Sequence, residues 1–92
     1  MQGMPRIEKE IIVMNKKGLH ARPAALFVQL VDKFNSKVTI VKGQEEINGR
    51  SIMGILMLGA QCSTKLKLVV EGADAEQAMK ELEGFLNKED EL

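Results

Sequence analysis

The sequence predicts an α+β fold, an open-faced β-sandwich in which a four-stranded antiparallel sheet carries three helices on one face. Two observations lead to this prediction. Segments with strand and helix patterns follow one another in the order β-α-β-β-α-β-α, which is typical of split βαβ folds. The last strand alternates apolar and charged residues, so one face of the sheet should meet solvent. A chain of 92 residues suits one domain, and we interpret residues 1–92 as that domain, with 1–6 as a flexible extension.

The first three elements are a strand, a helix and a strand. Residues Ile7–Met14 end in an apolar run typical of a strand. A helix is expected over Ala21–Phe34, because its apolar residues recur at steps of three and four. These residues are Ala24, Phe27, Val28, Val31 and Phe34. The β-branched segment Lys37–Val41 is the second strand.

The next three elements are shorter. A turn at Lys42-Gly43-Gln44 leads into a return strand at Glu45–Asn48. A brief helix is expected over Ser51–Leu58, with Gly59 able to end it. The alternating segment Thr64–Glu71 is the fourth strand.

The third helix is predicted to begin at Asp74. Asp74 and Gln77 have the spacing of a capping box. The apolar stripe of this helix consists of Ala75, Ala78, Met79, Leu82, Phe85 and Leu86. The polar residues 87–92 should form a frayed tail.

Composition argues against several classes of function. Basic and acidic residues both number 13, whereas a nucleic-acid-binding protein usually carries a positive excess on one face. No apolar run approaches the roughly 20 residues that cross a bilayer. One histidine and one cysteine cannot form a His/Cys zinc site, and no intrachain disulfide can form. We therefore expect no nucleic acid, membrane or metal partner, and a reducing, cytoplasmic location.

His20 is the best candidate for chemistry. It stands between a loop containing Gly18 and the first turn of a helix, where unpaired amides and the helix dipole favour an anion. Arg22 adds a planar cation suited to phosphate oxygens, and Pro23 suits the first turn. Spacing alone also fits a structural explanation, in which His20 is a loop or N-cap residue and Arg22 a solvated charge.

Two segments resemble motifs of the histidine-containing phosphocarrier (HPr) family of the bacterial phosphoenolpyruvate:sugar phosphotransferase system. Gly18-Leu19-His20-Ala21-Arg22-Pro23-Ala24 is similar to its active-site motif. Arg50-Ser51-Ile52-Met53-Gly54-Ile55-Leu56-Met57-Leu58-Gly59 is similar to its motif around a regulatory serine. The resemblance runs from about Ile7 to Leu86, and it implies the same open-faced β-sandwich.

The resemblance also implies residue roles. His20 would take a phosphoryl group on Nδ1 from phosphorylated enzyme I and pass it to a histidine of an enzyme IIA domain. Arg22 would be the charge partner of that group. The start of the helix would be shaped by Gly18, Ala21, Pro23 and Ala24. The protein would be a monomeric carrier with no cofactor of its own, not an enzyme with its own turnover.

The predicted second helix carries two apolar sides. Ile55 and Leu58 share one side, whereas Ile52, Met53 and Leu56 cluster on another. A short helix on a sheet does not readily bury both sides, so we expect the second cluster to be an exposed partner surface. A helix buried on all sides is the alternative. The resemblance favours docking of enzyme I and enzyme IIA.

Ser51 suits the N-cap of that helix. The resemblance adds phosphorylation by an HPr kinase/phosphorylase, after which a transcriptional regulator of carbon catabolite control binds. Both partners occur in a subset of bacteria.

Three alternatives are weighed against the sugar-branch carrier. A Ser-His-acid hydrolase would need a nucleophile elbow, which the surroundings of Ser51 lack. A regulatory binding module would not need His20 and Arg22, and a known paralogue has glutamine at the histidine position. A carrier of the nitrogen-related branch would share the chemistry but not the partners, and the Ser51-Ile52-Met53-Gly54 core favours the sugar branch.

Overall fold

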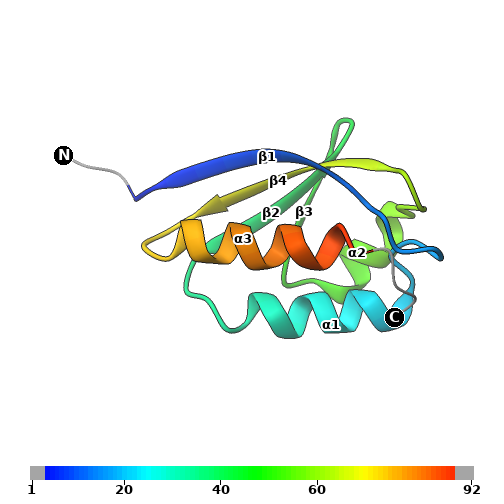
Figure 1. Ribbon diagram of the computed structural model, residues 1–92, viewed down its shortest axis with the longest axis horizontal. Helices are drawn as coiled ribbons and strands as arrows, with labels where there is room; N and C mark the ends of the chain where they lie inside the picture. The colour runs from blue at the N-terminus through cyan, green and yellow to red at the C-terminus, as the bar shows by residue number, and fades with distance from the viewer. Residues whose placement is uncertain (1–3, 89–92) are drawn as a thin grey trace.

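The computed structural model describes residues 4–88 and has one sheet with helices on one side (Figure 1). The strands are β1 (Arg6–Ile12), β2 (Lys37–Lys42), β3 (Glu45–Asn48) and β4 (Lys65–Glu71). The helices are α1 (Ala21–Val31), α2 (Ile52–Leu58) and α3 (Ala75–Leu86). The element order β-α-β-β-α-β-α and the predicted fold class are confirmed.

The strands lie in the order β1-β4-β2-β3, and every neighbouring pair is antiparallel. Strand β4 is central, so its residues have partners on both sides. Val70 lies opposite Ile7 of β1 and Val38 of β2. This register places the apolar residues of three strands in one row on the face that the helices cover.

The core lies between that face and the three helices. Leu66, Leu68 and Val70 of β4 are buried there, as the alternating pattern predicted. From α1, the aromatic ring of Phe27 is fully buried, and Leu82 of α3 is buried as well. Burial of each such side chain contributes about 1.5–3 kcal/mol, so packing can hold the helices on the sheet without a disulfide.

Several predicted boundaries shift by a few residues. Strand β1 ends at Ile12, although Val13 stays buried and its N–H donates to Thr64 at 2.9 Å. Helix α1 ends at Val31 and not at Phe34, because Arg50 donates to the carbonyl oxygens of Val31 (3.4 Å) and Phe34 (2.8 Å). These oxygens are therefore satisfied without a further helical turn.

The predicted extension is only partly outside the fold. Residues 1–3 lie outside the described part of the chain, as do residues 89–92 of the predicted frayed tail. Arg6 already belongs to β1, and the Pro5 carbonyl accepts the N–H of Gly72 at 2.9 Å. The sheet thus begins earlier than the sequence predicted.

The predicted capping box at α3 is wrong. Asp74 is the N-cap, but its side chain makes no cap hydrogen bond. One carboxylate oxygen instead accepts the Asn35 N–H at 2.9 Å, and the other accepts the Ser36 hydroxyl. The Gln77 amide donates to Glu81 at 2.7 Å, not back to the N-cap. Asp74 therefore ties the start of α3 to the segment between α1 and β2.

No helix within residues 4–88 combines the length and the apolar character needed to cross a bilayer.

Candidate functional site

The start of α1 holds His20 at the protein surface. Leu19, one residue earlier, is buried, and its N–H donates to the Ala60 carbonyl at 2.8 Å. His20 is the N-cap, with extended backbone angles of φ −84° and ψ −170°, and its ring is half-buried. Its side chain makes no cap hydrogen bond, so the ring is not committed to holding the helix.

Gly18 fixes this loop against the segment after α2. Its φ of +70° lies in the left-handed region, which favours glycine. A Cβ atom there would lie 2.4 Å from the Ala60 carbonyl oxygen and 2.7 Å from the Gln61 Cα. The close approach of two backbones therefore requires Gly18 for both conformation and space.

The first turn of α1 offers two backbone donors beside the ring. The Ala24 N–H is used within the helix, donating to the His20 carbonyl at 3.0 Å. Pro23 has no N–H to donate. Within residues 4–88, no partner accepts the amides of Ala21 and Arg22. Two unpaired donors at the positive end of the helix dipole can bind an anion.

Arg22 is exposed, two residues along α1 from the histidine. Among the described residues its guanidinium has no ion pair or hydrogen bond. The side chain is therefore available for a ligand or a partner protein.

A shallow hollow of about 300 Å³ connects the histidine to α2. His20 and Ala21 line it together with Leu56, which was predicted for the docking surface. Lys17 and Gln61 also line it, and sequence analysis missed both. Lys17 precedes Gly18 directly and could have been noticed, whereas nothing in the sequence marks Gln61, which is brought here by the turn after Gly59.

Helix α2 divides its apolar residues as predicted. Ile55 and Leu58 are buried, whereas Ile52 is 41% and Met53 66% exposed. Leu56 is half-buried at the edge of the hollow. Met57 is the most exposed of the large apolar residues, at 78%, and it was not among the predicted docking residues. We call Ile52, Met53, Leu56 and Met57 the α2 patch.

Ser51 begins α2 as its N-cap. Its Oγ accepts the Gly54 N–H at 2.9 Å, and its carbonyl accepts the Ile55 N–H at 3.0 Å. A Cβ on Gly54 would lie 3.0 Å from this oxygen, so Gly54 leaves room for the cap. The opposite end of α2 is closed by Gly59 at φ +63°, as predicted, and by the Lys42 ammonium, which donates to the Leu58 carbonyl at 2.9 Å.

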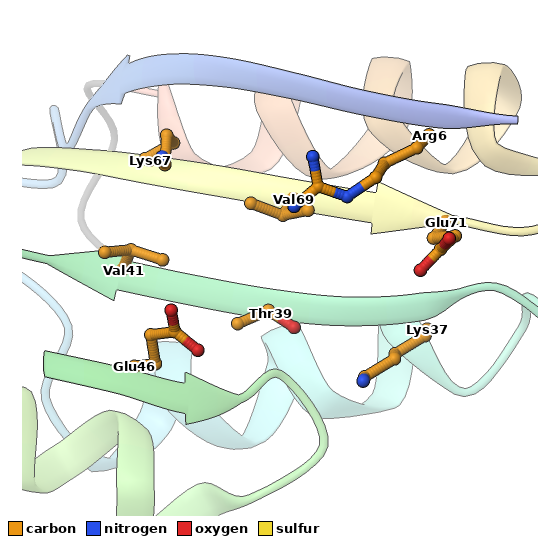
Figure 2. Close-up of a pocket in the computed structure, with 8 residues that line it drawn as sticks. All are labelled: Arg6, Lys37, Thr39, Val41, Glu46, Lys67, Val69 and Glu71. Carbon is orange, nitrogen blue, oxygen red and sulfur yellow. The ribbon is translucent and has the colours of Figure 1, made fainter.

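The helix-free face of the sheet carries a second hollow, of about 170 Å³ (Figure 2). In Figure 2 the Arg6 side chain extends over Val69, with Lys37, Thr39 and Glu46 on the strands beyond. None of the predicted site residues lines this hollow. Arg6 and Lys67 both pair with Glu8 on this face, and chiefly the hydrogen bond from Arg6 holds the pKa of that carboxyl below its usual range. The mixed charges indicate a solvated face.

Within the described residues, no group of three His, Cys, Asp or Glu side chains is arranged to hold a metal ion.

The comparisons with known proteins converge on one family. A model described as the PTS HPr component phosphorylation site matches residues 7–88. The chain belongs to the HPr family. The phosphocarrier protein HPr of Treponema pallidum is 43% identical over 86 residues, covering 92% of this chain and 98% of that protein. The HPr-like protein Crh of Halalkalibacterium halodurans is 42% identical, covering 90% of this chain and 99% of that protein.

The structural comparison agrees. A crystal structure of HPr from Bacillus anthracis matches with a TM-score of 0.85 and 38% identity, covering 88% of this chain and 96% of that chain. HPr proteins are phosphocarriers of the phosphotransferase system, and the Crh relatives fit carbon catabolite regulation within the same family.

Proposed function

We propose that His20 accepts a phosphoryl group from phosphorylated enzyme I and passes it to an enzyme IIA domain during sugar uptake. The observation that carries this proposal is the uncommitted ring of His20 at the start of α1, beside the unpaired amides of Ala21 and Arg22. A ring that held the helix would have to leave its cap to react. This ring does not cap the helix, so it is free to react.

The transfer is a substitution at phosphorus. The lone pair of His20 Nδ1 forms the new N–P bond while the bond from phosphorus to the enzyme I histidine breaks, and the electron pair stays with the leaving imidazole. Nε2 of His20 keeps its proton. The same exchange in the opposite sense delivers the group to enzyme IIA.

Positive groups around His20 support the phosphoryl group during transfer. Arg22 is close along the helix and has planar donors that suit phosphoryl oxygens. Gly18, Pro23 and Ala24 act indirectly, through the loop and the first helical turn that place the ring. The family needs no cofactor or metal on the carrier for this step, and the charge balance is supplied by side chains and backbone.

The α2 patch is the proposed docking surface for enzyme I and enzyme IIA. Ile52 and Met53 expose apolar area, and Leu56 links them to the hollow that contains His20. Exposed apolar clusters of this kind usually mark partner surfaces. A partner seated on α2 would therefore cover the phosphate-accepting ring at the same time.

Ser51 is the proposed regulatory phosphorylation site. It directly precedes Ile52, so a phosphate on Oγ places about two negative charges at the edge of the α2 patch. That charge would oppose docking of enzyme I. In bacteria that have them, the proposed partners of Ser51 are an HPr kinase/phosphorylase and a transcriptional regulator of carbon catabolite control. We place the protein in the cytoplasm as a monomer of one domain.

The deciding experiment incubates the protein with phosphoenolpyruvate, Mg²⁺ and enzyme I. We expect a mass gain of one phosphoryl group that is labile in acid and absent in His20→Ala. An acid-stable group, or full labelling of His20→Ala, would contradict the assignment.

Arg22 is tested by Arg22→Ala in the same reaction. We expect transfer to slow by about 10- to 100-fold, because a charge-assisted contact to the phosphoryl group is lost. Arg22→Lys keeps the charge without the planar donors and should fall between the two. Unchanged transfer in Arg22→Ala would remove this residue from the mechanism.

A second candidate function is a regulatory binding module without carrier activity. It is favoured by the match to the HPr-like protein Crh over almost its whole length. Such a protein would use the α2 patch and Ser51 but not His20. Lack of phosphorylation by enzyme I, together with phosphorylation of Ser51 by the kinase and ATP, would favour this function.

A further inference from the structure

Two methionines stand side by side in the α2 patch. Met53 and Met57 are four residues apart on one helix, so their side chains lie on the same face. They are 66% and 78% exposed, more than any other large apolar residue within residues 4–88. Burial protects a thioether from oxidants, and these two have little of it.

The other described methionines differ in exposure or in place. Met79 of α3 is buried in the core. Met14 is half-buried. Met4 is exposed but precedes β1, at the end of the molecule opposite α2 (Figure 1). Exposure and position coincide only at Met53 and Met57, because only these two are both accessible and on the proposed docking surface.

We propose that Met53 and Met57 are oxidation sites, and that their conversion to sulfoxides by a hydroperoxide weakens docking of enzyme I. The inference rests on the proposed docking role of the α2 patch. In each event the O–O bond of the peroxide breaks, an S–O bond forms, and water leaves. The sulfur loses two electrons and the peroxide gains them.

The physical consequence is a change of polarity without a change of fold. A flexible apolar side chain becomes a polar, chiral one that must be desolvated when a partner covers it. Ile55 and Leu58, on the buried side of α2, contain no sulfur, so the helix keeps its hold on the core. Oxidation therefore acts on the surface that the partner covers and leaves the site of chemistry at His20 intact.

The test compares two proteins in a Cys62→Ser background, because Cys62 is exposed and would also react with peroxide. One retains both methionines and the other carries Met53→Leu and Met57→Leu, which keep apolar volume but cannot be oxidised. Both are treated with hydrogen peroxide, quenched with catalase, and mapped by peptide mass spectrometry. The rate of phosphoryl transfer from enzyme I and the affinity for enzyme I are then measured.

We expect oxidation at Met53 and Met57 to lower the rate at sub-saturating carrier, and the affinity, by about tenfold. The leucine variant should keep its rate although Met4 is oxidised, and a Met4→Leu variant should lose activity like the parent. Normal transfer by protein with both sulfoxides, or equal loss in the leucine variant, would overturn the inference alone. If the untreated protein accepts no phosphoryl group, the proposed function fails and this inference falls with it.

Discussion

Helices α1 and α2 begin in the same way but use their first side chains differently. At α2, the Ser51 hydroxyl accepts the Gly54 N–H at 2.9 Å and holds the helix end. At α1, His20 occupies the same N-cap position, and its ring makes no cap bond. One side chain is occupied by structure, whereas the other is left for a ligand. A helix start therefore indicates a reactive site when its cap residue is polar, exposed and unused.

The third helix start supplies an intermediate case. Asp74 caps nothing in α3, but its carboxylate binds Asn35 and Ser36 across the molecule. It is occupied by tertiary structure instead of by its own helix. The three N-caps thus differ in what they hold, and each difference can be tested by substitution.

The largest expected effect comes from His20→Ala. Phosphoryl transfer should fall by more than about 1,000-fold because the nucleophile is lost. The free energy of unfolding should change by less than about 0.5 kcal/mol, since the ring holds no cap bond. Transfer is measured with labelled phosphoenolpyruvate, and stability by urea denaturation. A loss of more than about 1 kcal/mol would mean that His20 caps α1 after all.

Gly18→Ala should be the most damaging to stability. The left-handed φ and the overlap with the Ala60 carbonyl together should lower the free energy of unfolding by roughly 2–4 kcal/mol. Gly59→Ala is the matched control, because Gly59 has a similar φ of +63° but open space around it. It should cost about 1 kcal/mol. Equal losses measured by urea denaturation would show that the close approach at Gly18 is not a constraint.

Ser51→Ala should have a smaller effect, opposite in kind to that of His20→Ala. Loss of the cap should lower the free energy of unfolding by about 1 kcal/mol while transfer from enzyme I stays unchanged. Ser51→Asp should restore the cap but slow transfer, because it adds charge beside the α2 patch. The two measurements are thermal unfolding and the transfer rate. A stable Ser51→Ala protein would place the hold on α2 elsewhere.

The smallest effect is a pH dependence at Asp74. The hydrogen bond from Ser36, followed by that from the Asn35 amide, holds the pKa of Asp74 below its usual range. A carboxyl with a lowered folded pKa adds stability above its unfolded pKa, and this is lost as pH falls through the folded pKa. Thermal unfolding between about pH 7 and pH 3 should therefore show a larger drop for the native protein than for Asp74→Asn. Parallel curves would indicate that this carboxylate contributes nothing.

Local pattern was enough to predict most of the fold. The apolar steps in α1 and α3 placed Phe27 and Leu82 in the core, and the alternation in β4 chose its buried face. The sequence also predicted the position of His20 at a helix start and the division of α2 into two sides. All of these depend on residues close together in the chain.

What the sequence did not predict depends on distant residues. The capping box at Asp74 failed because Asn35 and Ser36, nearly 40 positions away, compete for its carboxylate. The end of α1 was misplaced because Arg50 satisfies its last carbonyls. Gln61 reaches the hollow beside His20 only after the chain turns at Gly59. None of these contacts has a signature in local spacing.

Arg50 has a mechanical consequence. Its guanidinium donates to the carbonyls of Phe34 and Ser36, at 2.8 and 3.1 Å, while its own backbone leads directly into Ser51. One side chain thus bolts the tail of the helix that carries His20 to the head of the helix that carries the α2 patch. Force applied where a partner lands is transmitted to the frame of the reactive ring, and the two helices move as one part.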